Sequence, residues 1–215
     1  FLGTSFLADA FFVAFRIPNT FRRLFAEGTF NSAFVPSYTS ELVKNKSRSN
    51  KFANDVFNLL FLALFFLVLI IEIFMPIFVG LIAPGFIENT KKFELATTLT
   101  RITFPFLLFV SLSSFFSAIL NSHNKFAAAS AAPIVLNIVL ITILFFGRYL
   151  GDELIYYLSY GISVAGLLQL IFLYRFVKKY YTLNFVFKFK INNKVKFFFK
   201  KLLPSIFSSG VTQIN

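Results

Sequence analysis

The stretch that decides the fold runs from residue 9 to residue 36 and reads DAFFVAFRIPNTFRRLFAEGTFNSAFVP. It is apolar enough to enter a membrane, yet it carries five charged side chains, which are Asp9, Arg16, Arg22, Arg23 and Glu27. A charge placed in hydrocarbon costs several kcal/mol, so charged side chains in such a segment face protein or water and mark a functional site by default. These five residues are therefore the candidate binding site.

The helical phase gathers most of these charges on one face. Asp9, Arg16 and Arg23 are spaced seven residues apart, and Glu27 follows four residues later. At about 100° per residue, these four positions form one narrow stripe. Arg22 lies off that stripe in a straight helix. A helix kinks where a proline such as Pro18 removes a backbone hydrogen bond, so the whole arginine pair can reach one cavity.

A purely structural interpretation of the same charges stays open. Arg23 and Glu27 have the spacing of an ordinary intrahelical ion pair. Structural ion pairs also occur inside membrane proteins, so the stripe by itself does not establish a binding site.

The composition predicts a helical membrane protein that crosses the bilayer several times. Hydrophobic residues make up 57% of the chain and charged residues 14%, and several apolar runs are long enough to span a bilayer. We expect an all-α transmembrane bundle with helices over residues 9–34, 56–83, 95–120, 126–146 and 154–177, and the start of another over 194–215. Residues 39–55 are polar and predict a loop, in which Asn54 or Asp55 caps the next helix.

Smaller features add expectations about packing. Pro105 predicts a kink, and a run of serines over 111–117 favours close helix contacts. Gly161 and Ala165 have the spacing of small residues at a helix–helix interface. The segment over 185–191, FVFKFKI, alternates apolar and charged residues, which is typical of a strand or an interfacial segment.

The net charge of +12 indicates orientation rather than nucleic-acid binding. When the basic stretch from Arg175 to Lys201 is counted with the fifth expected helix, the loops after the first, third and fifth helices carry fourteen Lys and Arg residues, and those after the second and fourth only three. The positive-inside rule places the richer loops in the cytoplasm. No basic face or recognition motif accompanies the charge, so we expect no nucleic-acid partner.

No catalytic or metal-binding set emerges from the sequence. There is no cysteine, which excludes disulfides and thiolate chemistry. The single His123 lies in the polar segment NSHNK and is expected to be a solvated loop residue. Glu72 interrupts an apolar run, and a lone intramembrane acid invites a proton-coupling role that we consider the minor alternative. We expect no metal, no cofactor and no enzymatic activity.

The run over 9–38 resembles the second transmembrane helix of the lipid II flippase (MviN) family. The resemblance continues in order through APGF at 83–86, RITFPFLLFVSLSSFFSAILN at 101–121, AAPIVLN at 131–137 and LPSIFSSGVTQIN at 203–215. It covers nearly the whole chain. Because the chain lacks an initiator Met and stops inside an apolar segment, we expect a fragment, the incomplete N-terminal lobe of a two-lobed, MATE-like transporter of the MOP superfamily.

The resemblance also implies a function and site residues. Members of this family flip lipid II, an undecaprenyl-diphosphate-linked peptidoglycan precursor, across the bacterial inner membrane by alternating access through an arginine-lined cavity. Arg22 and Arg23 match the family's arginine pair, Asp9 the acid that opens the helix, and Glu27 the acid of FAEG. Arg16 stands where the family often has a basic residue. The implied partners are lipid II and membrane lipids.

Two other function classes stay open at this stage. A related exporter could move polysaccharide-lipids or cationic drugs, although a site for drug cations would favour acids over an arginine cluster. A membrane scaffold, or an enzyme acting on lipid-linked sugars, is the other alternative. An enzyme of that kind would need clustered acids or histidines at a membrane face, which this sequence lacks.

Overall fold

The computed structural model describes residues 6–26, 29–147, 149–185, 195–196 and 198–200. The side chains of residues 17, 21–26 and 29 lie outside this description, as does most of FVFKFKI. Of the expected final helix over 194–215, residues 195–196 and 198–200 are described, and they are helical. The regular elements are eight α-helices, namely α1 (Phe6–Ala26), α2 (Thr29–Lys44), α3 (Lys46–Ile73), α4 (Met75–Ile82), α5 (Thr90–Thr103), α6 (Phe106–Ser122), α7 (Phe126–Gly147) and α8 (Leu154–Val177), and two 3-10 turns over Pro84–Phe86 and Gly151–Glu153. All regular structure in the described ranges is thus helical, which confirms the predicted fold class.

Four helical segments of the described chain are long and apolar enough to cross a membrane. They are Lys46–Ile73, Thr90–Ser122, Phe126–Gly147 and Gly151–Val177. We expected five spans. The helix α1 is 21 residues long, which gives about 31 Å at 1.5 Å per residue and would cross the hydrocarbon. It is not among the four, because four of its residues are charged.

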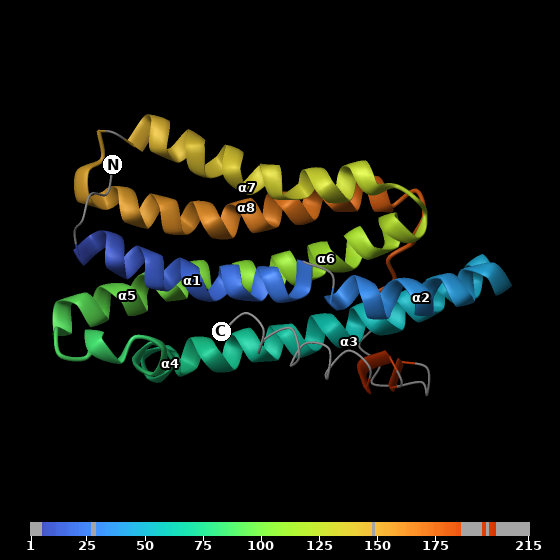
Figure 1. Ribbon diagram of the computed structural model, residues 1–215, viewed down its shortest axis with the longest axis horizontal. Coiled ribbons are helices and arrows are strands. Elements are labelled where there is room, and N and C mark those ends of the chain that lie inside the picture. The colour runs from blue at the N-terminus through green and yellow to red at the C-terminus, as the bar shows by residue number, and fades with distance from the viewer. Residues whose placement is uncertain (1–5, 27–28, 148, 186–194, 197, 201–215) are drawn as a thin grey trace.

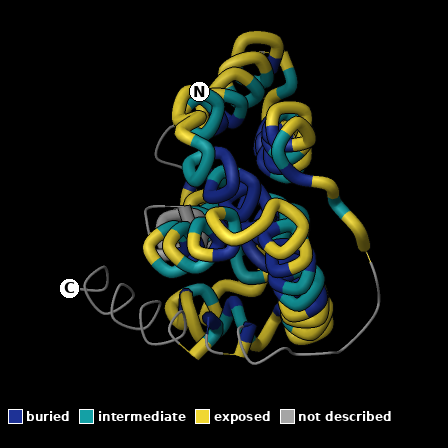
Figure 2. Tube along the Cα trace, turned by 90° about the vertical axis from the view of Figure 1, so that its right-hand side faces the viewer, coloured by how far each residue is buried: buried dark blue, intermediate teal, exposed yellow. Residues whose placement is uncertain are grey.

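The helices run roughly along one axis, with α6 in the centre of the bundle (Figure 1). The long helices α7 and α8 lie side by side on one flank, and α3 lies on the opposite flank. Helix α1 packs on α5 and α6, and α2 continues from it to pack on α3 and α6. Figure 2 shows the buried residues gathered in the middle of this arrangement and the exposed ones around it.

Two expected boundaries are wrong. The expected helix over 9–34 is two helices: α1 continues through Pro18 to Ala26, and α2 begins at Thr29. The polar stretch over 39–55 is not a loop either, because α2 runs to Lys44 and α3 starts at Lys46. The cap of α3 is Asn45, whose side chain accepts a hydrogen bond from the Ser47 N–H at 2.8 Å.

The remaining helices lie close to their expected positions. Helix α8 has the expected bounds, and α7 extends one residue beyond its expected range. The expected helix over 95–120 divides into α5 and α6, and the interruption falls at Pro105, where the kink was expected. The expected helix over 56–83 starts earlier, as α3, and is interrupted at Phe74 before α4.

The two ends of the bundle differ in charge. The end that holds the α2–α3 junction, the α6–α7 turn and the end of α8 is rich in cations, which include Lys44, Lys46, Arg48, Lys51, Lys125, Lys178 and Lys179. We call this the basic end. The opposite end, the acidic end, carries Asp9, Glu88, Glu94, Asp152 and Glu153 beside Lys91 and Lys92. The positive-inside rule predicts that the basic end faces the cytoplasm.

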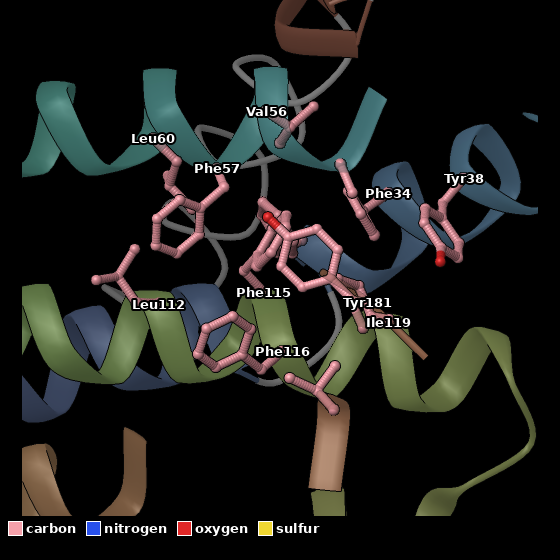
Figure 3. Packing of buried hydrophobic residues seen from close by; sticks show 14 of the residues in the cluster. Phe34, Tyr38, Val56, Phe57, Leu60, Leu112, Phe115, Phe116, Ile119 and Tyr181 are labelled. Carbon is pink, nitrogen blue, oxygen red and sulfur yellow. The ribbon is translucent and has the colours of Figure 1, made fainter. Parts of the chain in front are cut away.

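Aromatic side chains fill the core near the basic end (Figure 3). The ring centroids of Phe34 and Phe115 are 5.2 Å apart at 63°, and those of Phe57 and Phe116 are 5.9 Å apart in a stacked arrangement. Buried aromatic pairs of this geometry add about 0.5–1.5 kcal/mol beyond the burial of their area. They join α2, α3 and α6 into one cluster with Tyr181 after α8.

An asparagine pair on α3 holds the chain where it leaves α8. The Asn50 side chain accepts from the Thr182 N–H at 3.0 Å and donates to the Thr182 carbonyl at 3.2 Å. Asn54, one turn further on, accepts from the buried Tyr181 hydroxyl at 2.6 Å and from the Asn184 N–H at 2.7 Å. These bonds satisfy backbone groups that have no helical partner, because α8 has ended.

Small residues close the contacts of α8, as the sequence predicts. Gly161 and Ala165 are both fully buried. A Cβ at Gly161 would collide with Ile143 of α7, and one at Gly166 would lie 3.2 Å from Phe109 of α6. Buried Ser111, Ser113 and Ser114 likewise place α6 among its neighbours.

Candidate functional site

The described part of the charged stripe of α1, Asp9 and Arg16, lies on the outer face of this bundle. Ala10, Ala14 and Pro18 face inward and are buried, whereas Asp9 and Arg16 are exposed. The described part of the stripe therefore does not point into the core of this chain. Asp9 and Arg16 instead face the surroundings of the lobe on the outer side of α1.

Asp9 forms its ion pair with a neighbouring helix. Its Oδ2 atom lies 2.6 Å from Nζ of Lys92 on α5, at the acidic end, and 59% of the Asp9 side chain is exposed. The Lys92 ammonium also sits 4.3 Å from the centroid of the Phe86 ring, a cation–π contact. An ion pair this exposed contributes at most about 1 kcal/mol to stability. The pair is of interest because it links α1 to α5, not because it is strong.

Arg16 lies about 10 Å further along α1 at 1.5 Å per residue, which puts it at membrane depth. Its guanidinium forms no hydrogen bond or ion pair with the part of the chain that the structure describes. Only its backbone carbonyl is engaged, by the Thr20 hydroxyl at 2.9 Å. A free, exposed guanidinium at this depth requires water or another polar partner beside it.

The other three candidate residues are only partly placed. Arg22 and Arg23 belong to the last turns of α1, but their side chains are outside the described residues, as is all of Glu27. Whether the arginine pair faces a cavity therefore stays a prediction. So does the pairing of Arg23 with Glu27.

A hydrogen bond from α5 explains how α1 passes through Pro18 without unwinding. Pro18 has no N–H, so the carbonyl of Ala14, one turn earlier, loses its helical donor. The hydroxyl of Thr103 lies 3.0 Å from that carbonyl and 3.1 Å from the carbonyl of Thr100 in its own helix. Ala14 and Thr103 are both fully buried, where an unpaired carbonyl is costly. Thr103 thus fixes α1 and its charged face against α5.

The same device operates where α5 meets α6. Pro105 removes the helical donor to the Arg101 carbonyl and interrupts the helix there, and the next carbonyl, that of Ile102, has no backbone donor among the described bonds. The hydroxyl of Ser163 on α8 donates to it. The interruption is therefore held by α8 rather than by solvent.

The structure also shows the surroundings of His123 and Glu72, two other residues that the sequence singled out. His123 is not a solvated loop residue, because its Nε2 lies 3.3 Å from the Tyr38 hydroxyl and its ring stacks on Tyr180 at 4.7 Å. Burial, assisted by the nearby Lys46 charge, lowers the pKa of His123 below its usual value. Glu72 lies in the last turn of α3, and its buried Oε1 atom has no hydrogen-bond partner in the described ranges.

Lys92 and Thr103 contact the candidate site on α1, and the sequence did not predict either contact. Lys92 stands in a nearly charge-balanced segment and gave no signal of its own. Thr103 is 89 residues from Ala14, so no local pattern links them. The one clue was the presence of prolines in two apolar helices, which obliges some other group to donate to the freed carbonyls.

The described ranges contain no group of three or more His, Asp or Glu side chains that could hold a metal. Helices long enough to span a bilayer, opposite charge at the two ends and charged residues on an outer face together define a multi-pass helical membrane protein.

Comparison with known proteins narrows this class. The family model described as lipid II flippase MurJ matches residues 1–215. A probable lipid II flippase MurJ of Rhizobium tropici is 41% identical over 220 residues, which cover all of this chain and 41% of that protein. The corresponding protein of Rickettsia prowazekii is 41% identical over 215 residues, or 99% of this chain and 42% of its own length.

A solved structure agrees with these relatives. The structure of lipid II flippase MurJ in an inward closed conformation superposes with a TM-score of 0.84 at 27% identity, over all of this chain and 43% of that one. The chain belongs to the lipid II flippase MurJ family, a family of transporters with the MOP-type fold. It spans about two fifths of the length of the relatives it matches.

The bond between Thr103 and Ala14 is open to a direct test. We expect Thr103→Val to destabilise the whole protein by about 1–3 kcal/mol, because it leaves a buried carbonyl without a donor while keeping the side-chain shape. The measurement is thermal unfolding in detergent, followed by far-UV circular dichroism. Thr98→Val is the matched control, since that exposed hydroxyl bonds only to Glu94 of its own helix. Equal unfolding temperatures for the two variants would show that the bond does not support α1.

Proposed function

We propose that this chain is one lobe of a transporter that moves lipid II from the cytoplasmic to the outer face of the bacterial inner membrane. The match to the flippase family over all of residues 1–215 carries the proposal. The lipid-linked diphosphate would bind in a cavity between this lobe and the remainder of the protein. The protein would act as a transporter without a cofactor rather than as an enzyme.

The outer stripe of α1 supports that location for the cavity. Asp9 and Arg16 are exposed on this lobe, and charges exposed to lipid tails are costly. A water-filled cavity, closed on its other side by residues outside this chain, removes that cost. The stripe would then form one wall of the substrate path.

The arginine pair would bind the diphosphate. Arginine keeps its charge and presents two parallel N–H donors, which match the oxygens of a phosphate. Arg22 and Arg23 follow Arg16 on the same helix, about one to two turns nearer the basic end. Glu27 would neutralise the pair while the cavity is empty.

The pair between Asp9 and Lys92 would act at the outer end of the path. The partner of Asp9 in the structure is Lys92 on α5. A pair that is exposed, weak and placed between two helices can break and re-form during alternating access. We therefore assign Asp9 to an ion pair with Lys92 that breaks and re-forms at the acidic end, which we call the latch, rather than to phosphate binding.

The alternatives from the sequence are less well supported. An exporter of polysaccharide-lipids or drugs could share the fold, but the family match names lipid II flippases. A scaffold would not need an exposed arginine at membrane depth that has no partner among the described residues. We retain neither as a second proposal.

Charge reversal at the arginine pair tests the diphosphate role. We expect the whole protein carrying Arg22→Glu with Arg23→Glu to fail to restore growth of a flippase-depleted bacterium, because two carboxylates repel the diphosphate. Arg22→Lys should restore growth only partly, since lysine cannot donate the two parallel bonds. Arg48→Glu with Lys51→Glu, an equal charge reversal on exposed residues of the basic end, is the control. Normal growth of the arginine double variant at normal protein levels would remove the pair from the mechanism.

The latch is tested by exchanging its charges. We expect Asp9→Asn and Lys92→Gln each to impair complementation at unchanged protein levels, because the pair contributes little to folding. The exchanged variant, Asp9→Lys with Lys92→Asp, should recover part of the function by restoring the attraction. Growth of Lys92→Gln cells at the wild-type rate would contradict the latch.

A further inference from the structure

A cavity of about 410 Å³ opens at the basic end, away from the α1 stripe. Its walls come from the α6–α7 turn, the first turn of α7 and the end of α8. The lining residues that matter are Asn124, Lys125, Ala127, Phe176, Lys179 and Tyr180. We call this the α7 cavity.

The lysine and tyrosine groups that line this cavity have hydrogen-bond donors to offer and no polar partner in the described part of the chain. The ammonium groups of Lys125 and Lys179 form no ion pair or hydrogen bond within the described ranges. The same holds for the hydroxyl of Tyr180, although its ring is fixed by stacking on His123 at 4.7 Å. No acidic residue is among the described residues that line the cavity. This chemistry selects an anion.

The backbone around Lys125 is rigid and adds further donors. Asn124 adopts a positive φ of 58°, and the Lys125 N–H bonds to the Leu120 carbonyl at 2.9 Å, which forms a tight cap on α6. Helix α7 then begins at Phe126, and its 22 residues include no acid in the first turn. The first N–H groups of a helix have no intrahelical acceptor and favour negative charge.

The position of the cavity indicates what kind of anion binds there. It lies where three membrane-spanning segments end, at Ser122, Phe126 and Val177. Its outer walls include Phe126, which is 56% exposed, and Phe176, which is 44% exposed. An exposed apolar stripe on α7, made of Ile134, Ile138 and Ile141, continues from it toward the other end of the bundle. An anion at this depth is therefore the head group of an amphiphile whose chains lie along α7.

We propose that the α7 cavity binds the phosphate of an anionic phospholipid from the leaflet at the basic end. Lys125 and Lys179 donate to the phosphate oxygens, and Tyr180 and the first turn of α7 add neutral donors. The acyl chains lie against the isoleucine stripe. The site is separate from the proposed path of lipid II, so its test does not depend on transport.

The test is a binding titration of the whole protein in detergent with phosphatidylglycerol, followed by native mass spectrometry. We expect Lys125→Gln with Lys179→Gln to weaken binding roughly tenfold, since two charge-assisted bonds are lost. Arg48→Gln with Lys51→Gln removes the same charge from exposed residues of the same end, outside the cavity, and should leave binding within about twofold of wild type. Ala127→Leu keeps both lysines but fills the cavity, and should also weaken binding.

Several outcomes would overturn the proposal. Equal weakening by the two double variants would mean that only surface charge attracts the lipid. Unchanged binding by the cavity variants, with helix content retained by circular dichroism, would place the lipid elsewhere. If zwitterionic phosphatidylcholine bound as tightly as phosphatidylglycerol, the anionic selectivity would be wrong. If millimolar inorganic phosphate displaced the phosphatidylglycerol completely, the cavity would be a site for free phosphate rather than for a lipid.

Discussion

A backbone carbonyl freed by a proline inside an apolar bundle must find another donor, and this constraint organises the lobe. Pro18 frees the buried carbonyl of Ala14, and the helix interruption at Pro105 leaves the carbonyl of Ile102 without a described backbone donor; hydroxyl groups from other helices donate to both. Thr103 thereby joins α5 to α1, and Ser163 joins α8 to the α5–α6 interruption. The charged face of α1 is held in place by a bond that none of its charged residues makes. The helix at Pro18 and the interruption at Pro105 are therefore points of attachment between helices.

Charge has a second, separate role in the architecture. The acidic and basic ends orient the lobe, whereas the stripe on α1 interrupts an apolar surface at membrane depth. The charged ends need only solvent and lipid head groups around them. The α1 stripe needs a polar environment within the membrane, and membership of the flippase family supplies a reason for such an environment. The weak Asp9–Lys92 pair lies where the two patterns meet, at the acidic end of α1.

The sequence predicted the fold class and the apolar helices well, because hydrophobic run length reports membrane crossing directly. Helices α7 and α8 begin at the expected residues for that reason. The prediction of a loop over 39–55 was wrong, because polarity there marks where the chain leaves the membrane rather than where a helix ends. Helices α2 and α3 run through this stretch, and Asn45 between them is the N-cap of α3. The sequence also did not reveal which residues contact the candidate site on α1. The contacts of Asp9 with Lys92 and of Ala14 with Thr103 join residues more than 80 positions apart, which no local pattern encodes.

The central claim is that the protein containing this lobe moves lipid II across a membrane. The most direct measurement reconstitutes the purified whole protein in liposomes that contain a head-group-labelled fluorescent lipid II, and follows how much label becomes accessible to a membrane-impermeant quencher. The account predicts that nearly all of the label is quenched with the wild-type protein, and only the outer-leaflet half with protein-free liposomes or with Arg22→Glu combined with Arg23→Glu. Quenching of the second half at equal rates by the wild-type protein and the arginine variant would contradict the assigned site. No transfer of lipid II by an intact, folded wild-type protein would contradict the function itself.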